Sequence, residues 1–194
     1  MKYSHVLRLT LVFAAFGLPA CQNKSETTSQ TAVDSTALQP PASATVALPQ
    51  APITDRLRIL GLTQTGDWRG ITPGDSIGRA RRSEKAAKSA LFEEDATHIG
   101  YGIELTDLES MDVQYVHQNG LITTIQADLY LNDKSSVAAY TADLTAYFSA
   151  RYRKPTVTDN QTTWAGPRGG QISLKNVSKG KDYGLKVSIR KPLA

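Results

Sequence analysis

The sequence predicts an α+β domain with the order helix–three strands–helix–three strands, in which an antiparallel sheet carries its helices on one face. Two stretches show apolar residues at helical spacing, and most stretches between them alternate apolar with polar residues. Composition also changes sharply near residue 55. We therefore assign residues 1–20 to a signal peptide, 21–54 to a disordered tether and 55–194 to a single domain.

The first 20 residues have the three parts of an export signal. Lys2 and Arg8 precede an apolar run over residues 9–16, and small or helix-breaking residues follow at 17–20. The apolar run is too short for a membrane span, which needs about 20 apolar residues. We therefore expect a signal that is removed.

Leu18-Pro19-Ala20-Cys21 resembles the lipobox of bacterial lipoproteins, in which the cysteine receives diacylglycerol and becomes the mature N-terminus. Cys21 is the only cysteine of the chain, and a lipid-capped thiol escapes unwanted oxidation. The resemblance implies lipid attachment at Cys21. In the lipoproteins of enteric bacteria, Asp after the cysteine favours retention in the inner membrane. Gln22 at this position therefore implies the outer membrane facing the periplasm, with the cell surface as a second location. The alternative is an ordinary signal peptide with an incidental cysteine.

The tether that follows is rich in small and polar residues. Of the 33 residues at 22–54, 24 are Ser, Thr, Pro, Ala or Gln, and none is aromatic. Such a segment cannot bury enough apolar surface to become ordered. A flexible chain of this length spans roughly 30 Å.

The domain begins with a helix and a strand. Pro73-Gly74-Asp75-Ser76 predicts a turn with a helix N-cap, and the helix should continue to about Leu91. Its apolar stripe is expected to comprise Ile77, Ala80, Ala87 and Leu91. A strand over 99–105 follows.

A hairpin comes next, because residues 111–131 alternate apolar with polar side chains. Asn119-Gly120 is typical of a two-residue turn, but that loop would place Val113 opposite Gln126. A three-residue loop, Gln118-Asn119-Gly120, pairs Val113 with Ile125 and keeps one face apolar, with Gly120 in a left-handed conformation. We therefore predict the three-residue loop.

A second helix is predicted over 134–152, ended by Pro155, with its apolar face made by Val137, Tyr140, Thr141, Leu144, Tyr147 and Phe148. Three strands should follow near 156–164, 170–177 and 183–190. In the last, Tyr183, Leu185, Val187 and Ile189 face one way, so the sheet should have one wet face. The repeated order suggests two related halves, about 74–131 and 132–191.

This order, with Trp68-Arg69-Gly70-Ile71-Thr72-Pro73-Gly74-Asp75-Ser76 entering the first helix, resembles small outer-membrane lipoproteins of the BamE/SmpA type. It is also similar to the repeats of beta-lactamase-inhibitor-like domains. The residues that carry the resemblance are Pro73-Gly74-Asp75 before a helix. The resemblance implies an assembly or protein-binding role.

Catalytic, cofactor and metal motifs are not found, so we assign no catalytic, cofactor-binding or metal-binding residue. His98 and His117 have no carboxylate at metal-ligand spacing and are interpreted as ordinary surface or hydrogen-bonded histidines. Weaker candidates are Arg168 in a glycine-rich loop and the acidic cluster Glu93-Glu94-Asp95. Further weak candidates, each also explained by folding alone, are Arg79, Arg81, Arg82, Trp68 and Trp164.

Charge is distributed unevenly. Residues 55–150 hold 9 Lys/Arg against 14 Asp/Glu, a net of −5, whereas 151–194 hold 10 against 2, a net of +8. Export argues against nucleic acid as a partner, so the expected partners are the membrane, through the lipid, and an envelope protein or an anionic cell-wall polymer. The leading hypothesis is a non-catalytic protein-binding or scaffold module. The alternatives are an enzyme for envelope polymers using Glu104 and Asp128, and a structural lipoprotein that contacts the wall through its basic end.

Replacing Cys21 by Ser removes the thiol that would carry the lipid, so fatty-acid labelling should be lost and the protein released from membranes. Metabolic labelling with fractionation measures both. Label or membrane attachment that persists in the variant would contradict the assignment.

Overall fold

Three helices and eight antiparallel strands are found in residues 50–166 and 169–191, the part of the chain that this computed structural model describes. The helices are α1 (Asp55–Ile59), α2 (Ile77–Ala86) and α3 (Lys134–Tyr152). The strands are β1 (Ala90–Glu94), β2 (His98–Thr106), β3 (Glu109–Gln118), β4 (Leu121–Leu131), β5 (Thr156–Thr158), β6 (Gln161–Ala165), β7 (Gln171–Asn176) and β8 (Tyr183–Arg190).

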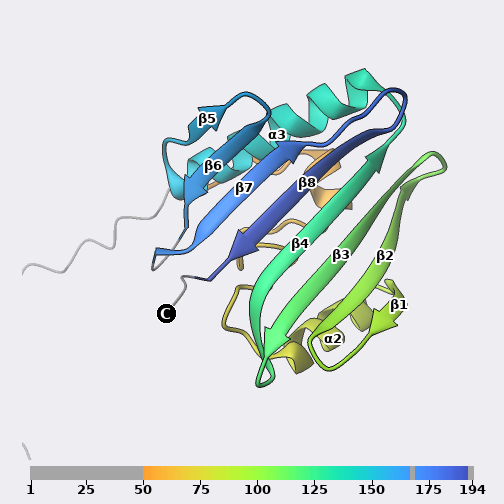
Figure 1. The fold of residues 1–194 in the computed structure, drawn as a ribbon, viewed down its shortest axis with the longest axis vertical. Coiled ribbons are helices and arrows are strands. Elements are labelled where there is room, and N and C mark those ends of the chain that lie inside the picture. Colours follow the sequence, from red (N-terminus) through yellow and green to blue (C-terminus); the bar gives the residue numbers. More distant parts are fainter. Residues whose placement is uncertain (1–49, 167–168, 192–194) are drawn as a thin grey trace, which may run out of the picture. The chain divides into compact units, whose positions relative to one another are not determined.

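The strands form a single open sheet in the order β1-β2-β3-β4-β8-β7-β6-β5. Each half of the chain contributes a four-strand meander, and the two meanders meet where β4 pairs with β8 (Figure 1). α2 and α3 lie behind this sheet in Figure 1, and no described helix covers the other face. The α+β class and the one-sided arrangement of helices are therefore confirmed, while a duplication of the two halves stays a prediction.

Two of the predicted strand boundaries were wrong. The stretch predicted as one strand over 156–164 contains a tight turn, so that Thr158 pairs with Gln161 and β5 and β6 form a hairpin. Residues 90–94, of which only the first two were expected in the first helix, form the edge strand β1. The order within the domain is thus four strands after α2 and four after α3.

α3 has the predicted bounds. Its N-cap is Asp133, whose carboxylate accepts a hydrogen bond from the Ser136 amide, and it ends where Arg153 takes a left-handed conformation before Pro155. Five of the six predicted inward side chains are buried, namely Val137, Tyr140, Leu144, Tyr147 and Phe148. They pack α3 against β6, β7 and β8.

α2 is shorter than predicted. The helix ends at Ala86 because Lys88 adopts a φ of 59°, and the Ser89 amide then donates to the Glu84 carbonyl at 3.0 Å. This is the pattern of a Schellman C-terminus. Leu91, which was expected on the helix, is 55% exposed on β1. The inward face of α2 consists instead of Ile77, Ala80 and Glu84.

The β3–β4 hairpin corrects the predicted three-residue loop. Gln118 pairs with Leu121, so Asn119 and Gly120 alone form the turn, with φ of 52° and 75° as a type I′ turn requires. A bulge at Thr123 then shifts the register by one residue. Val113 consequently faces Ala127, and the apolar face is kept by the bulge and not by a longer loop.

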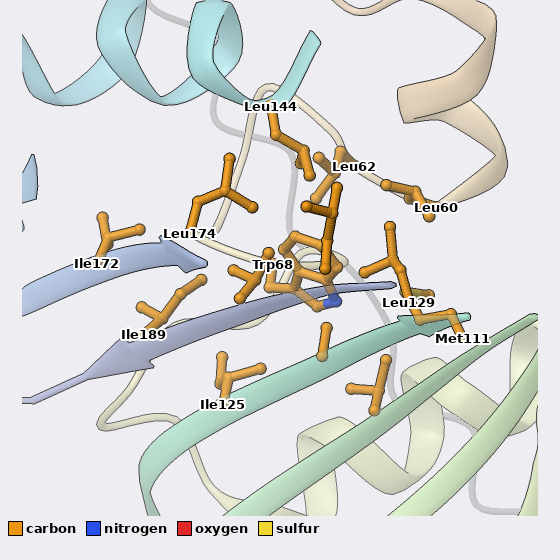
Figure 2. Packing of buried hydrophobic residues seen from close by; sticks show 14 of the residues in the cluster. Leu60, Leu62, Trp68, Met111, Ile125, Leu129, Leu144, Ile172, Leu174 and Ile189 are labelled. Carbon is orange, nitrogen blue, oxygen red and sulfur yellow. The ribbon is translucent and has the colours of Figure 1, made fainter. Parts of the chain in front are cut away.

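The core fills the space between the sheet and the helices. Trp68, 1% exposed, lies among side chains from α3 and from strands β4 and β8 (Figure 2). Its ring stacks on Phe148 with 6.5 Å between ring centres. The folded part also includes Ala51, which is 3% exposed, a few residues before the expected boundary at residue 55.

Trp68 reaches the core through a two-residue turn. Trp68 and Ile71 exchange backbone hydrogen bonds of 2.8 and 3.0 Å, so Arg69 and Gly70 occupy the turn with φ of 51° and 76°. A left-handed conformation is unfavourable for arginine and needs compensation from its surroundings. That compensation comes from Glu84.

The Glu84 carboxylate is fully buried and completely hydrogen-bonded. Arg69 donates to it through Nε and Nη2, both at 2.9 Å, in a bidentate ion pair. The Ser89 and Tyr115 hydroxyls also donate to it, and Arg69 Nη1 donates to the Leu60 carbonyl at 2.9 Å. One ion pair therefore joins α2, the segment before it and β3.

Burial by itself raises the pKa of Glu84, but the hydrogen bonds and charge of Arg69, with the two hydroxyls, outweigh it and hold the pKa below its ordinary 4.5. A lowered pKa means that the folded state favours the ionised form. Its contribution to stability is present above the unfolded pKa and is lost as pH falls through the folded one.

Replacing Glu84 by Gln leaves the Arg69 charge buried without its partner. We expect the free energy of unfolding at pH 7 to fall by about 3 kcal/mol. The difference from the unsubstituted protein should shrink as pH falls below the ordinary carboxyl pKa of 4.5 and through the lowered folded pKa of Glu84, because its carboxylate is then protonated as well. Urea denaturation at several pH values measures both effects.

The matched control is Glu94→Gln, which breaks the surface pair of Glu94 with Arg81. This change should cost less than about 1 kcal/mol, because exposed pairs contribute little. Equal losses in the two variants would contradict the role given to the buried pair.

Candidate functional site

The uncovered face of the sheet is polar because strand alternation sends its apolar residues to the helix side. On β8, Leu185, Val187 and Ile189 are buried under the helices, while Lys186 and Arg190 lie on the other side. The predicted wet face is thus confirmed. We call it the open face.

A hollow of about 1080 Å³ lies on the open face, and we call it the open-face hollow. Its floor is formed by one end of strands β3, β4, β8, β7 and β6. Lys154, Arg190 and Lys191 are the charged residues among its described lining, which contains no carboxylate. Trp164 also lines it, but its side chain is buried on the helix side, where Nε1 donates to the Ser149 hydroxyl at 3.1 Å.

A second hollow, of about 680 Å³, lies at the same end of the strands, and Gly170, Gln171, Arg190 and Lys191 line both hollows. The buried Asp67 accepts a hydrogen bond there from the Tyr152 hydroxyl. Burial, followed by the hydrogen bond and charge of Asp67, raises the pKa of Tyr152 well above its ordinary value. Arg151 lies over the rings of Tyr147 and Tyr152 and donates to the Gln64 carbonyl at 2.8 Å. These groups bind α3 to the segment around Trp68.

The acidic cluster Glu93-Glu94-Asp95 lies beside His98, which is a hydrogen-bonded surface histidine as the sequence predicts. The β1–β2 hairpin places His98 Nε2 3.2 Å from Glu93 and Nδ1 3.1 Å from Asp95. Asp95 also accepts hydrogen bonds from the amides of Thr97 and His98, and these lower its pKa to about 2. This is the geometry of a hydrogen-bonded surface turn. Nowhere in residues 50–166 and 169–191 do three or more potential metal ligands converge.

The other charged candidates are occupied by neighbouring groups or remain apart. Arg79 contacts Asp75 at 3.0 Å and Arg81 pairs with Glu94, whereas Arg82 is exposed. Glu104 is exposed on β2, and Asp128 on β4 lies 3.1 Å from Lys186 Nζ.

Glu104 and Asp128 lie on strands separated by β3 and line neither hollow. In the second hollow, Asp67 is held by Tyr152, and Asp75 by Arg79 and the Thr72 amide.

Trp68 and Trp164 are core residues, as predicted. His117, at the end of β3, has both ring nitrogens buried without a hydrogen-bond partner among the described residues. Cys21, the signal peptide and Arg168 lie outside the described residues, although Gly169 and Gly170, on the far side of Arg168, line the open-face hollow.

Comparison of the chain with protein-family models, with curated proteins and with solved structures found no match. None of the helices in the described residues has both the length and the apolar character needed to cross a membrane.

Sequence reasoning missed the residues that define the open-face hollow. The net charge of +8 over 151–194 indicates a basic end, but not that Lys154, two residues after α3, lines the same hollow as Arg190 and Lys191 at the end of β8. Pairing of β8 with β7 and of β7 with β6 brings these sites together. Strand order was the missing information.

Replacing Tyr152 by Phe removes the hydroxyl that donates to the buried Asp67 carboxylate. We expect the free energy of unfolding to fall by about 2 kcal/mol, because a buried charged acceptor loses its donor. Chemical denaturation measures this. The control is Tyr140→Phe, since the buried Tyr140 has no hydroxyl hydrogen bond within the described part of the chain. A loss as large in the control would contradict a specific Asp67–Tyr152 interaction.

Proposed function

We propose that the chain is a non-catalytic, lipid-anchored binding module of the bacterial envelope, and that the open face is its binding surface. The lipobox-like Leu18-Pro19-Ala20-Cys21 motivates the anchor, and Gln22 motivates the outer membrane. The tether over 22–54 would let the domain reach a ligand at a distance from the lipid. The resemblance to BamE/SmpA-type lipoproteins implies a binding role of the same general kind.

One observation carries this proposal, namely the open-face hollow on a face that no helix of residues 50–166 and 169–191 covers. Its floor is built from paired strands, which hold side chains more rigidly than loops do. Its lining is polar and basic, so it offers hydrogen-bond donors and acceptors. Because the strands hold these groups in place, binding a ligand would order few side chains and cost little conformational entropy. These are the properties of a preformed recognition surface.

The enzyme alternative finds less support. Catalysis of hydrolysis on polymers commonly requires two carboxylates that face one another across the substrate. In the open-face hollow no described lining residue is acidic, and in the second hollow Asp67 and Asp75 are engaged by folding contacts. Binding therefore agrees better with the arrangement of side chains.

A photo-reactive amino acid at Thr156 or Gln171 tests the proposal, because both residues are exposed at the open-face hollow. Irradiation of intact cells should give a specific adduct from these positions. The same amino acid at Ala138 or Ala142, exposed on α3, serves as the control and should give little adduct. Adducts only from the α3 positions, or from neither pair, would contradict the open face as the binding surface.

A further inference from the structure

The three cations of the open-face hollow lack partners within the described chain. Lys154 and Lys191 form no ion pair among the described residues, and Arg190 donates only to the Ser188 hydroxyl, at 3.2 Å. Elsewhere on the open face, Lys186 is neutralised by Asp128 at 3.1 Å. Positive charge that gathers in a concave surface without counter-charge attracts anions.

Amide and hydroxyl groups make up most of the remaining lining. Such groups donate and accept hydrogen bonds at once, as the hydroxyls of a sugar do. They belong to Gln118, Gln126, Gln171, Thr123, Thr124, Thr156 and Thr163. The hollow therefore combines fixed positive charge with groups suited to hydroxyl-rich ligands.

The lining offers little to a protein or a lipid tail. Protein interfaces bury a core enriched in aromatic residues, and membrane-binding surfaces insert large apolar side chains. In this hollow the apolar side chains on the open face are Val116 and Ala165. The large exposed residues Phe92 and Tyr130 lie outside its lining. These facts favour a polar ligand.

The length of the hollow favours an oligomer, whereas its volume of about 1080 Å³ lies at the upper end of the range for a single small ligand, about 300–1000 Å³. Its lining runs from β3 across β4, β8, β7 and β6 to Thr156 at the start of β5. Five strand spacings of about 4.8 Å give a path of about 24 Å.

We infer that the open-face hollow binds a strand of anionic glycan. Its carboxylate or phosphate groups contact Lys154, Arg190 and Lys191, while its hydroxyls hydrogen-bond to the glutamine and threonine side chains. The inference rests on the proposed use of the open face and adds the class of ligand. The sequence suggested that the whole basic end, residues 151–194, contacts the cell wall. The present inference assigns that contact to three side chains of this segment.

The test uses the full chain and measures binding to a carboxylated oligosaccharide, an alginate hexamer, by calorimetry at low and at physiological salt. The triple variant Lys154→Gln/Arg190→Gln/Lys191→Gln should bind at least tenfold more weakly. The matched control, Lys85→Gln/Lys179→Gln/Lys181→Gln, makes the same charge change on exposed residues away from the hollow and should bind normally. Binding should weaken as salt is raised, because the attraction is screened.

Three further probes identify the ligand class. A neutral hexasaccharide tests the sugar alone, polyphosphate of equal charge tests the charge alone, and phosphatidylglycerol vesicles test a lipid source. The inference expects the alginate hexamer to bind more tightly than each of them. Equal binding of polyphosphate, stronger binding of vesicles, or an equal loss in the control variant would overturn it. A specific protein adduct at Thr156 together with no glycan binding would overturn the inference while leaving the proposed function intact.

Discussion

The Arg69–Glu84 ion pair is the constraint on which the arrangement of this domain depends. A carboxylate with no solvent exposure is tolerated only when its charge and all its hydrogen-bonding capacity are satisfied. Here the guanidinium of Arg69 and the hydroxyls of Ser89 and Tyr115 meet that requirement. Because these groups come from the Trp68 turn, the end of α2 and β3, the pair can form only when all three are in place. It also offsets the unfavourable left-handed backbone of Arg69.

The same ion pair helps to hold the described helices on one face of the sheet. With Arg69 tied to Glu84, the adjacent Trp68 enters the core between α3 and the strands, and α2 is held against β3. The apolar face of α3 packs against β6, β7 and β8, so the described helices lie on one side of the sheet (Figure 1). The opposite side retains the polar residues of the alternating strands, and Lys154, Arg190 and Lys191 gather at one end of it. Binding is therefore proposed for the open face, against which no described helix packs.

The sequence predicted correctly the features that depend on residues close together in the chain. The bounds of α3 follow from its apolar period, its Asp133 cap and Pro155, and the alternation in β8 follows from a half-buried strand. Prediction failed where distant residues decide the outcome. Glu84 occupies an inward position of α2 that Arg69, Ser89 and Tyr115 make acceptable. The apolar stripe was extended wrongly to Leu91 because Lys88 ends the helix in a left-handed conformation without a glycine to indicate it. The bulge at Thr123 likewise determines how β3 pairs with β4, and the length of the turn alone does not predict this register. The open-face hollow depends on strand order, which has no signal in a single sequence.

The most direct test of the open face as the occupied surface is lysine reactivity measured by mass spectrometry, in isolated envelopes and in the purified protein. Lys154 and Lys191 lie at the open-face hollow, whereas Lys85, Lys179 and Lys181 are exposed away from it. The account predicts that acylation of Lys154 and Lys191 falls in envelopes while the other three lysines react as before. Unchanged reactivity at Lys154 and Lys191, or equal protection of all five, would contradict it.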